Sequence, residues 1–244
     1  MWPFRKTVTL AQSGILKGMT DCHSHLLPGV DDGVETLDES LEILAEMEKL
    51  GVKKVWLTPH VMEDIPNKTV ALQQKFRELK QSYNGTMELN LAAEYMLDNL
   101  FEKRLEKDDL LPLEEGKRYL LVETSYFNPP MGLKNILLRI KSKGYYPLLA
   151  HPERYEYMQI KEYKALKETH ISFQLNAPSL VGIYGRHVQD KAETLLKAGM
   201  YDYIGCDTHS RNIFLTTLEI KIKKLKYWQL PKYLFYGRML LYNA

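Results

Sequence analysis

Short apolar segments alternate with amphipathic segments along most of this chain, and nearly every apolar segment ends on a polar residue. The apolar segments predict strands that end at His23, His60, Glu94, Glu123, His151, Asn176 and Asp207. This alternation is typical of a parallel α/β barrel or of a doubly wound sheet. In an α/β barrel, the C-terminal ends of the strands surround one mouth, where active sites form. Residues placed for solubility alone would not recur at almost every strand end, so the pattern favours the barrel.

The boundaries of the expected elements follow from apolar periodicity and from capping signals. After the strand that leads into His23, we expect strands over 52–60, 87–95, 118–124, 145–151, 170–176 and 201–209. Helices are expected over 36–51, 69–83, 98–107, 132–144 and 188–198. At the first helix, Thr36 and Glu39 form a capping-box pattern, and Gly51 marks the end.

Length, charge and cysteine content limit the number of domains, the partners and the cellular compartment that we expect. A chain of 244 residues suits one large domain better than two. The net charge of +2 gives no reason to expect nucleic acid as a partner. Cys22 and Cys206 do not make a disulfide framework, which favours a reducing compartment. The chain lacks an apolar run of about 20 residues and a signal-peptide pattern, so we expect a cytoplasmic protein without stable membrane insertion.

Nine side chains are candidate metal ligands, beginning with the His-x-His pair His23 and His25. On an extended strand, these two imidazoles project from the same face and suit a divalent metal. The full set is His23, His25, Asp32, His60, Glu94, Glu123, His151, Asp207 and His209. A mixed imidazole and carboxylate site suits Zn, Mn or Fe, and the set exceeds what one ion can use. Two or three ions bridged by a carboxylate such as Glu94 would clamp the oxygens of a phosphoryl transfer.

Each candidate also has an ordinary structural explanation when it is taken alone. Asp32 lies in a sequence that suits a turn, and His60 follows a proline at an expected strand end. Glu94 and Glu123 suit pairing with lysines at the rim of a barrel, and an isolated His151 suits a structural role. These separate explanations do not account for the joint occurrence of the residues at strand ends, which favours a metal site.

Two arginines follow the last ligand segments and are candidates for binding phosphate. Arg154 lies in HPERY and Arg211 in DTHSR, and guanidinium groups hold phosphate oxygens in a bidentate way. A surface salt bridge is the alternative for both, and Arg186 is a weaker third candidate. Cysteine-based phosphatase chemistry is excluded, because no arginine lies six residues after Cys22 or Cys206.

Six short motifs resemble the PHP (polymerase and histidinol phosphatase) superfamily: DCHSHLLPGVDDG, TPH, AAEY, LVETS, AHPERY and GCDTH. More closely, they are similar to its bacterial protein-tyrosine phosphatases, which are encoded with capsule and exopolysaccharide genes. The resemblance covers residues 19–211. It implies a single PHP-type catalytic domain over 19–244, preceded by an N-terminal extension over 1–18. It also implies a distorted (β/α)7 TIM-like barrel with the active site at the C-terminal ends of its strands.

The resemblance further implies a trinuclear site that prefers manganese, with iron or zinc as alternatives. One ion would bind His23, His25, Glu94 and Asp207. A second would bind Asp32, His60 and His209. A third would share Glu94 and add Glu123 and His151. Arg154 matches the phosphate-binding arginine of the family, whereas Arg211 matches less closely because the loop after DTH is shorter. Arg154, Arg211 and His209 are the catalytic residues predicted in this way.

The implied reaction is hydrolysis of phosphotyrosine on a protein by in-line attack of a metal-bridging hydroxide. The implied substrate is the tyrosine-rich C-terminal tail of a bacterial tyrosine autokinase that controls polysaccharide export. One alternative is a PHP-family phosphoesterase that acts on a small molecule such as histidinol phosphate. Another is a regulatory or binding domain that keeps its metal without turnover, although the complete ligand set argues against it. The sequence makes no prediction of the oligomeric state.

Two terminal segments lie outside these motifs. Trp2, Phe4, Arg5 and Lys6 suit a contact with a membrane surface or a partner, but for residues 1–18 a loosely ordered tail is the simpler expectation. The basic and aromatic stretch 219–244 suits a closing helix, an oligomer contact or a membrane-facing patch. The near-helical spacing of its Leu, Tyr and Trp residues favours packing against the domain.

Overall fold

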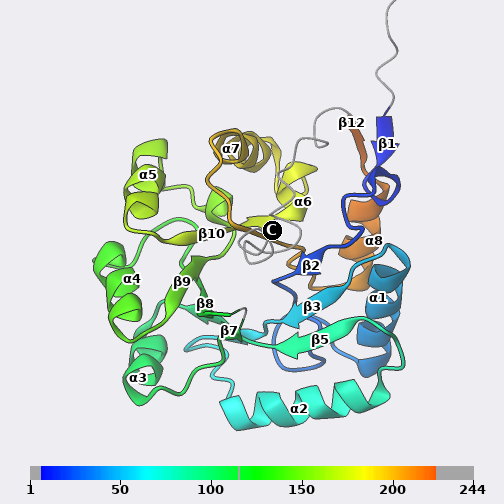
Figure 1. The fold of residues 1–244 in the computed structure, drawn as a ribbon, viewed down its shortest axis with the longest axis horizontal. Coiled ribbons are helices and arrows are strands. Elements are labelled where there is room, and N and C mark those ends of the chain that lie inside the picture. Colours follow the sequence, from blue (N-terminus) through cyan, green and yellow to red (C-terminus); the bar gives the residue numbers. More distant parts are fainter. Residues whose placement is uncertain (1–6, 115, 224–244) are drawn as a thin grey trace, which may run out of the picture.

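Parallel strands form the centre of the molecule, and the helices lie around their outer side (Figure 1). The computed structural model describes residues 7–114 and 116–223. The parallel strands are β2 (Thr20–Asp21), β3 (Lys54–Leu57), β4 (His60–Val61), β5 (Glu88–Leu91), β6 (Glu94–Met96), β8 (Arg118–Glu123), β9 (Tyr146–Leu149), β10 (Ser172–Asn176) and β11 (Tyr203–Gly205). One sheet has the order β11-β10-β9-β8-β6-β4, and a smaller one has the order β2-β3-β5.

All seven expected strand segments are present, and two of them are interrupted. The expected strand 52–60 covers β3 and the first residue of β4, and the expected strand 87–95 covers β5 and the first two residues of β6. The two sheets are therefore linked along the chain through these breaks. At the far ends of the sheets, the Cys22 N–H donates to the carbonyl of Ile204 at 3.3 Å. The result is a mixed α/β fold in which the parallel strands curl into at least half a barrel.

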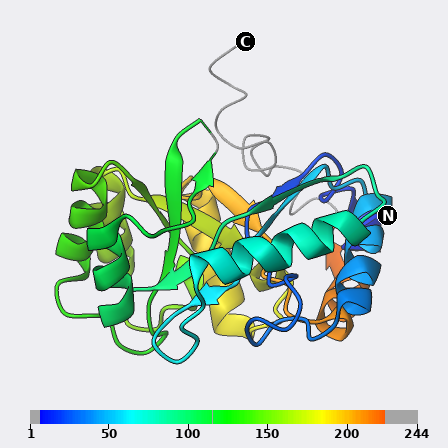
Figure 2. The same cartoon turned by 90° about the horizontal axis from the view of Figure 1, so that it is seen from below.

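Five helices lie where the sequence predicts them. They are α1 (Leu37–Lys49), α2 (Thr69–Ser82), α3 (Asn99–Lys107), α4 (Leu133–Ser142) and α7 (Arg186–Lys197). The hydroxyl of Thr36 accepts a hydrogen bond from the Glu39 N–H at 3.2 Å and so begins α1 as expected. Figure 2 shows α2 lying across the strands, with further helices on both flanks. Within the described ranges, no helix combines the length and the hydropathy that a membrane span needs.

Three further helices and three short strands are additions to the expected elements. The helices are α5 (Ile160–Glu168), α6 (Ala177–Leu180) and α8 (Arg211–Glu219). The strands are β1 (Thr7–Thr9), β7 (Leu113–Glu114) and β12 (Lys221–Lys223). At α5 the cap is Gln159, whose N–H donates to the Glu162 side chain at 2.9 Å. Glutamine is a weaker start signal than Ser, Thr, Asp or Asn, which explains why the pattern did not predict this helix.

The first described residues pack into the domain. β1 pairs with β12 in antiparallel fashion, and Leu10 and Leu16 are buried in the main core. The expectation of a loosely ordered tail is therefore wrong for residues 7–18, because their apolar side chains contribute to that core. The aromatic and basic residues 2–6 and the stretch 224–244 lie outside the described residues.

Apolar side chains on the two faces of the strands form two separate clusters. Leu120 and Val122 of β8 join the main core, which also contains most of the buried apolar residues of the helices. Leu121 and Leu148 join a smaller cluster on the opposite, concave face of the sheet. Because alternate strand residues point to opposite faces, Glu123 lies on the same face as Leu121. The concave face therefore has an apolar base, and polar residues follow it at the strand ends.

Candidate metal centre

All nine predicted ligands come together at the C-terminal ends of the parallel strands. They form four overlapping groups, and within each group the potential ligand atoms lie within 4.8 Å of one another. The groups are His25–Asp32–His60–His209, His23–His25–Asp207, His23–Glu94–His151 and His60–Glu94–Glu123. The shared members join the four groups into one continuous cluster.

Glu94 lies at the centre of this cluster and is completely buried. Its Oε2 atom is 3.1 Å from Nε2 of His23, 3.1 Å from Nδ1 of His60 and 3.4 Å from Nε2 of His25. Its Oε1 atom is 3.1 Å from Nε2 of His151. The parallel register of β4 and β6 pairs His60 directly with Glu94, which explains why these two side chains meet.

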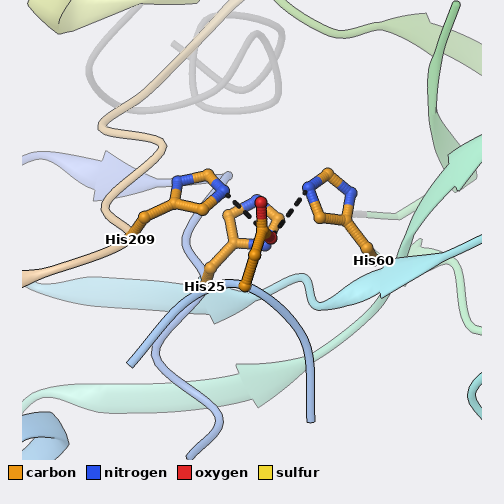
Figure 3. Close-up of side chains that lie close together, drawn as sticks. His25, His60 and His209 are labelled. Atoms are coloured by element: carbon orange, nitrogen blue, oxygen red, sulfur yellow. Dashed lines mark ion pairs between the residues drawn. The ribbon is translucent and has the colours of Figure 1, made fainter. Parts of the chain in front are cut away.

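The outer side of the cluster is formed by His25, His60 and His209, whose rings lie together with His25 between the other two (Figure 3). The rings of His25 and His209 are stacked, with centroids 3.9 Å apart. Oδ1 of Asp32 is 3.5 Å from Nε2 of His60 and 3.6 Å from Nε2 of His209. The Asp32 side chain is 66% exposed, so this side of the cluster is open to solvent.

Two residues that sequence reasoning did not select orient the central histidines. Asp31 Oδ2 is 2.8 Å from Nδ1 of His25 and accepts the backbone N–H of His60 at 2.9 Å. Gln174 Oε1 is 3.1 Å from Nδ1 of His23. When Nδ1 donates to such an acceptor, Nε2 keeps its lone pair for a metal ion. Both histidines direct Nε2 toward Glu94.

The buried charges of the cluster perturb one another strongly. Burial raises the pKa values of Glu94 and Asp207, but neighbouring imidazoles outweigh it and hold both well below the ordinary range. Burial lowers the pKa of His23, but the charges of Glu94 and Asp207 outweigh it and raise the pKa to about 9. Burial and the charge of His25 lower the pKa of His209. The carboxylates therefore stay ionised, and protons and metal ions compete for the imidazoles.

The donor atoms suit binding to divalent metal ions better than hydrogen bonding to one another. Oε2 of Glu94 and Nδ1 of His60 lie 3.1 Å apart but make no hydrogen bond within the described structure, and neither does Nδ1 of His151; all three atoms are buried. Buried polar atoms that make no hydrogen bond are costly, and proteins rarely keep them without a ligand. Imidazole and carboxylate donors in this number suit Mn, Fe or Zn.

A cavity of about 340 Å³ opens over the cluster. Its lining residues are Asp32, His60, Glu94, Tyr126, His151, Arg154, Ile183, Tyr184, Asp207, His209 and Ile213. The volume lies at the lower end of the range of about 300–1,000 Å³ for small-ligand pockets. Six of the predicted ligands and Arg154 therefore share one cavity with four uncharged side chains.

Arg154 is held in a fixed orientation at this cavity. Its guanidinium carbon is 4.3 Å from the ring centroids of both Tyr126 and Tyr184. Its Nη1 atom donates to Oδ2 of Asp207 at 2.9 Å. The other guanidinium N–H groups have no hydrogen-bond partner among the described residues. They are available for the oxygens of an anion, in the planar geometry that suits phosphate.

The other two arginine candidates lie away from the cavity. Arg211 is the first residue of α8, and its Nε atom pairs with Oε2 of Glu42 at 2.8 Å. Arg186 pairs with Asp190, four residues later on α7, at 2.9 Å. The structure thus brings Arg154 to the predicted ligands and leaves Arg211 and Arg186 in surface salt bridges.

Known proteins with a similar sequence or fold place the chain in a family. The family model described as "Capsular polysaccharide synthesis, CpsB/CapC" matches residues 19–224. The tyrosine-protein phosphatase CpsB of Streptococcus pneumoniae is 30% identical over 210 residues, covering 79% of this chain and 83% of that protein. The tyrosine-protein phosphatase YwqE of Bacillus subtilis is 28% identical over 200 residues, covering 79% and 78%.

A solved structure supports the same grouping at the level of the fold. It comes from crystal structures of YwqE from Bacillus subtilis and CpsB from Streptococcus pneumoniae, described as metal-dependent tyrosine phosphatases. It matches with a TM-score of 0.78 and 23% identity, covering 92% of this chain and 94% of the matched one. With the family match over most of its length and the curled parallel sheet it shares with that structure, the chain belongs to the CpsB/CapC family of capsular polysaccharide synthesis.

Proposed function

We propose that this chain is a metal-dependent phosphatase that hydrolyses phosphotyrosine on proteins during capsular polysaccharide synthesis. The observation that carries the proposal is the shared cavity, in which Arg154 faces the same space as six predicted metal ligands. Relatives named tyrosine-protein phosphatases support this function over the small-molecule alternative, histidinol phosphate.

Two or three divalent ions, with manganese preferred over iron or zinc, would occupy the cluster. His23, His25, Glu94 and Asp207 would hold one ion. Asp32, His60 and His209 would hold a second. Glu94, Glu123 and His151 would hold a third. When bound, such ions lower the pKa of coordinated water and neutralise charge on phosphoryl oxygens. Two of the groups support the first two sites, since they contain His23, His25 and Asp207 and then Asp32, His60 and His209. The support for the third site is that His151 and Glu123 each belong to a group that contains Glu94.

The protein's own residues would bind and orient the phosphate. Arg154 would donate its free N–H groups to phosphoryl oxygens, and its contact with Asp207 would fix the plane of the guanidinium. His209 lines the cavity and its side chain is a quarter exposed, so it would be within reach of a bound substrate. A phenolate is a comparatively good leaving group, and the reaction therefore needs no strong general acid.

The finer description of the fold and the setting is also a proposal. We infer that the parallel strands close into a distorted (β/α)7 barrel over 19–244, with residues 1–18 as an extension. The Cys22 to Ile204 hydrogen bond and the bridge between Ser24 and Thr208 support closure between β2 and β11. That Cys22 and Cys206 form no disulfide supports a reducing, cytoplasmic setting. The expected substrate there is the tyrosine-rich tail of a tyrosine autokinase.

The decisive experiment is hydrolysis by purified protein that has been stripped of metal and then reconstituted with manganese. We would compare a phosphotyrosine peptide, a phosphoserine peptide and histidinol phosphate. Selective release of phosphate from the phosphotyrosine peptide is the expected result. Preference for histidinol phosphate would overturn the protein substrate while keeping the metal site. No turnover of any of the three with metal bound would favour a binding domain instead.

A further inference from the structure

Four residues that line the cavity carry neither a charge nor a predicted ligand atom: Tyr126, Ile183, Tyr184 and Ile213. Tyr126 follows β8, Ile183 and Tyr184 lie between α6 and α7, and Ile213 lies in the first turn of α8. Three separate segments of the chain therefore bring apolar surface to the same cavity. The hydrolysis of a phosphate group alone does not require this surface, which suggests that it contacts another part of the substrate.

The local backbone fixes Ile183 and Tyr184 in place. Gly182 and Gly185 flank them and have φ values of 85° and 91°, which glycine adopts most readily. The Gly185 N–H donates to the carbonyl of Gly182 at 3.0 Å, which closes a turn whose two central residues are Ile183 and Tyr184. The Tyr184 hydroxyl accepts a hydrogen bond from Nδ2 of Asn176 at 3.3 Å. The turn therefore presents a preformed pair of apolar side chains to the cavity.

The position of Arg154 sets the distance between this surface and a bound phosphate. Its guanidinium lies 4.3 Å from the ring centroids of both Tyr184 and Tyr126, so a phosphate bound to its free edge would lie near these rings. Because Ile183 and Tyr184 line the same cavity, a group attached directly to the phosphate oxygen would be able to contact them. An aromatic ring reaches and covers apolar surface there, whereas the single methylene of phosphoserine covers far less.

We propose that Ile183 and Tyr184 form a subsite for the aromatic ring of the substrate and set the preference for aryl over alkyl phosphate esters. The inference rests on the proposed phosphatase function and adds the residues that select its substrate. Tyr184 has a second role as a positioning residue, since its ring covers one face of Arg154. Ile183 has no aromatic ring and so cannot stack on the guanidinium as Tyr184 does. The two residues can therefore be separated by experiment.

The first test compares two ligands that differ in their use of the subsite. Inorganic phosphate occupies only the charged part of the cavity, whereas a phosphotyrosine peptide occupies both parts. Ile183→Ala should lower kcat/KM for the peptide about tenfold, as loss of apolar contact in a binding pocket does. It should leave the inhibition constant of phosphate within about twofold of wild type. Unchanged kcat/KM for the peptide, or equal weakening of both ligands, would overturn the subsite.

Ile160 supplies a matched control, because it is 43% exposed at the start of α5 and does not line the cavity. Ile160→Ala should change neither value by more than about twofold. The metal content of each variant, measured by elemental analysis, should equal that of wild type. If wild-type protein loaded with manganese fails to hydrolyse the peptide, the proposed function fails. If wild type is active and Ile183→Ala behaves like Ile160→Ala, only the subsite fails.

The second test addresses the positioning role of Tyr184. Tyr184→Phe keeps the ring beside Arg154 and loses only the hydrogen bond from Asn176. It should retain the phosphate inhibition constant within about twofold. Tyr184→Leu removes the ring, and it should weaken both phosphate and the peptide by about tenfold. Equal behaviour of the Phe and Leu variants toward phosphate would contradict the positioning role.

Discussion

Gly205 offers a direct test of whether the position of His23 controls activity. A Cβ atom at residue 205 would lie 2.5 Å from Cβ of His23 and 3.0 Å from its backbone nitrogen. Carbon atoms in unstrained contact are about 3.5–4.0 Å apart, so Gly205→Ala requires His23 to move by about 1 Å. His23 touches both Glu94 and Asp207, and its displacement changes the geometry of the whole cluster.

We expect Gly205→Ala to lower kcat/KM for a phosphotyrosine peptide about 100-fold, the typical effect of a 1 Å misplacement at a reacting centre. Overpacking should also lower the free energy of unfolding by about 1–3 kcal/mol. The assay combines steady-state kinetics with manganese present, urea unfolding and measurement of bound metal.

A matched control separates lost stability from lost geometry. At Gly199 the φ value is 66° and no atom lies within 4 Å of an added Cβ. Gly199→Ala should therefore cost about 1–2 kcal/mol through backbone strain, without a change in kcat/KM. If Gly205→Ala kept wild-type activity and metal content, the requirement for His23 at its present position would be refuted.

Three further predictions address the ligands, the arginines and the pH dependence. Asp31→Asn should weaken metal binding about 10- to 100-fold in a chelator competition, because His25 loses a carboxylate acceptor for Nδ1. Arg211→Ala should leave kcat/KM within about twofold and change the free energy of unfolding by less than about 1 kcal/mol, since its partner is the exposed Glu42. Because the pKa of His23 is about 9 without metal, metal binding at lower pH displaces a proton. Affinity measured by calorimetric titration should therefore rise between about pH 6 and pH 8.

The ligands at the strand ends could be predicted because side chains alternate along a strand. Trp56 and Ala92 belong to the apolar cluster of the concave face. His60 and Glu94 follow them by an even number of residues and lie on the same face, at the cluster of ligands. Apolar runs that end on His, Glu or Asp therefore carried enough information to bring together distant residues.

The supporting residues were harder to find from the sequence. Asp31 and Asp32 are adjacent and chemically identical, and only the structure shows which of them accepts from His25. Gln174 is an uncharged strand residue, so it did not resemble a metal ligand. Its spacing was the available signal, because it shares a face with Asn176 two positions later. Tyr184 lies in a turn that no ligand pattern marks. Residues that position other side chains leave a weaker signal in the sequence, since many side chains can supply one hydrogen-bond acceptor or one apolar contact.

Arg211 shows how a helix start decides which side chain faces a site. Ser210 caps α8, and Ile213 in its first turn lines the cavity. Residues two apart on a helix do not share a face, so Arg211 points away and pairs with Glu42. The motif places Arg211 close to His209 in sequence, but the register of the helix determines its direction.

His151 and Asp207 both depart from regular strand geometry, and for His151 this departure places the side chain in the cluster. Leu149 belongs to the helix-side core, so alternation alone would send His151 away from the concave face. His151 instead has a φ value of 31° and Asp207 one of 50°, both in the left-handed region. Such conformations cost about 1–3 kcal/mol and persist where surrounding contacts hold them. Gln174 accepts the His151 N–H at 3.0 Å. Histidine and aspartate tolerate this region better than most side chains, and both bind metal ions. The backbone and the chemistry of the site therefore favour the same residue types at these strand ends.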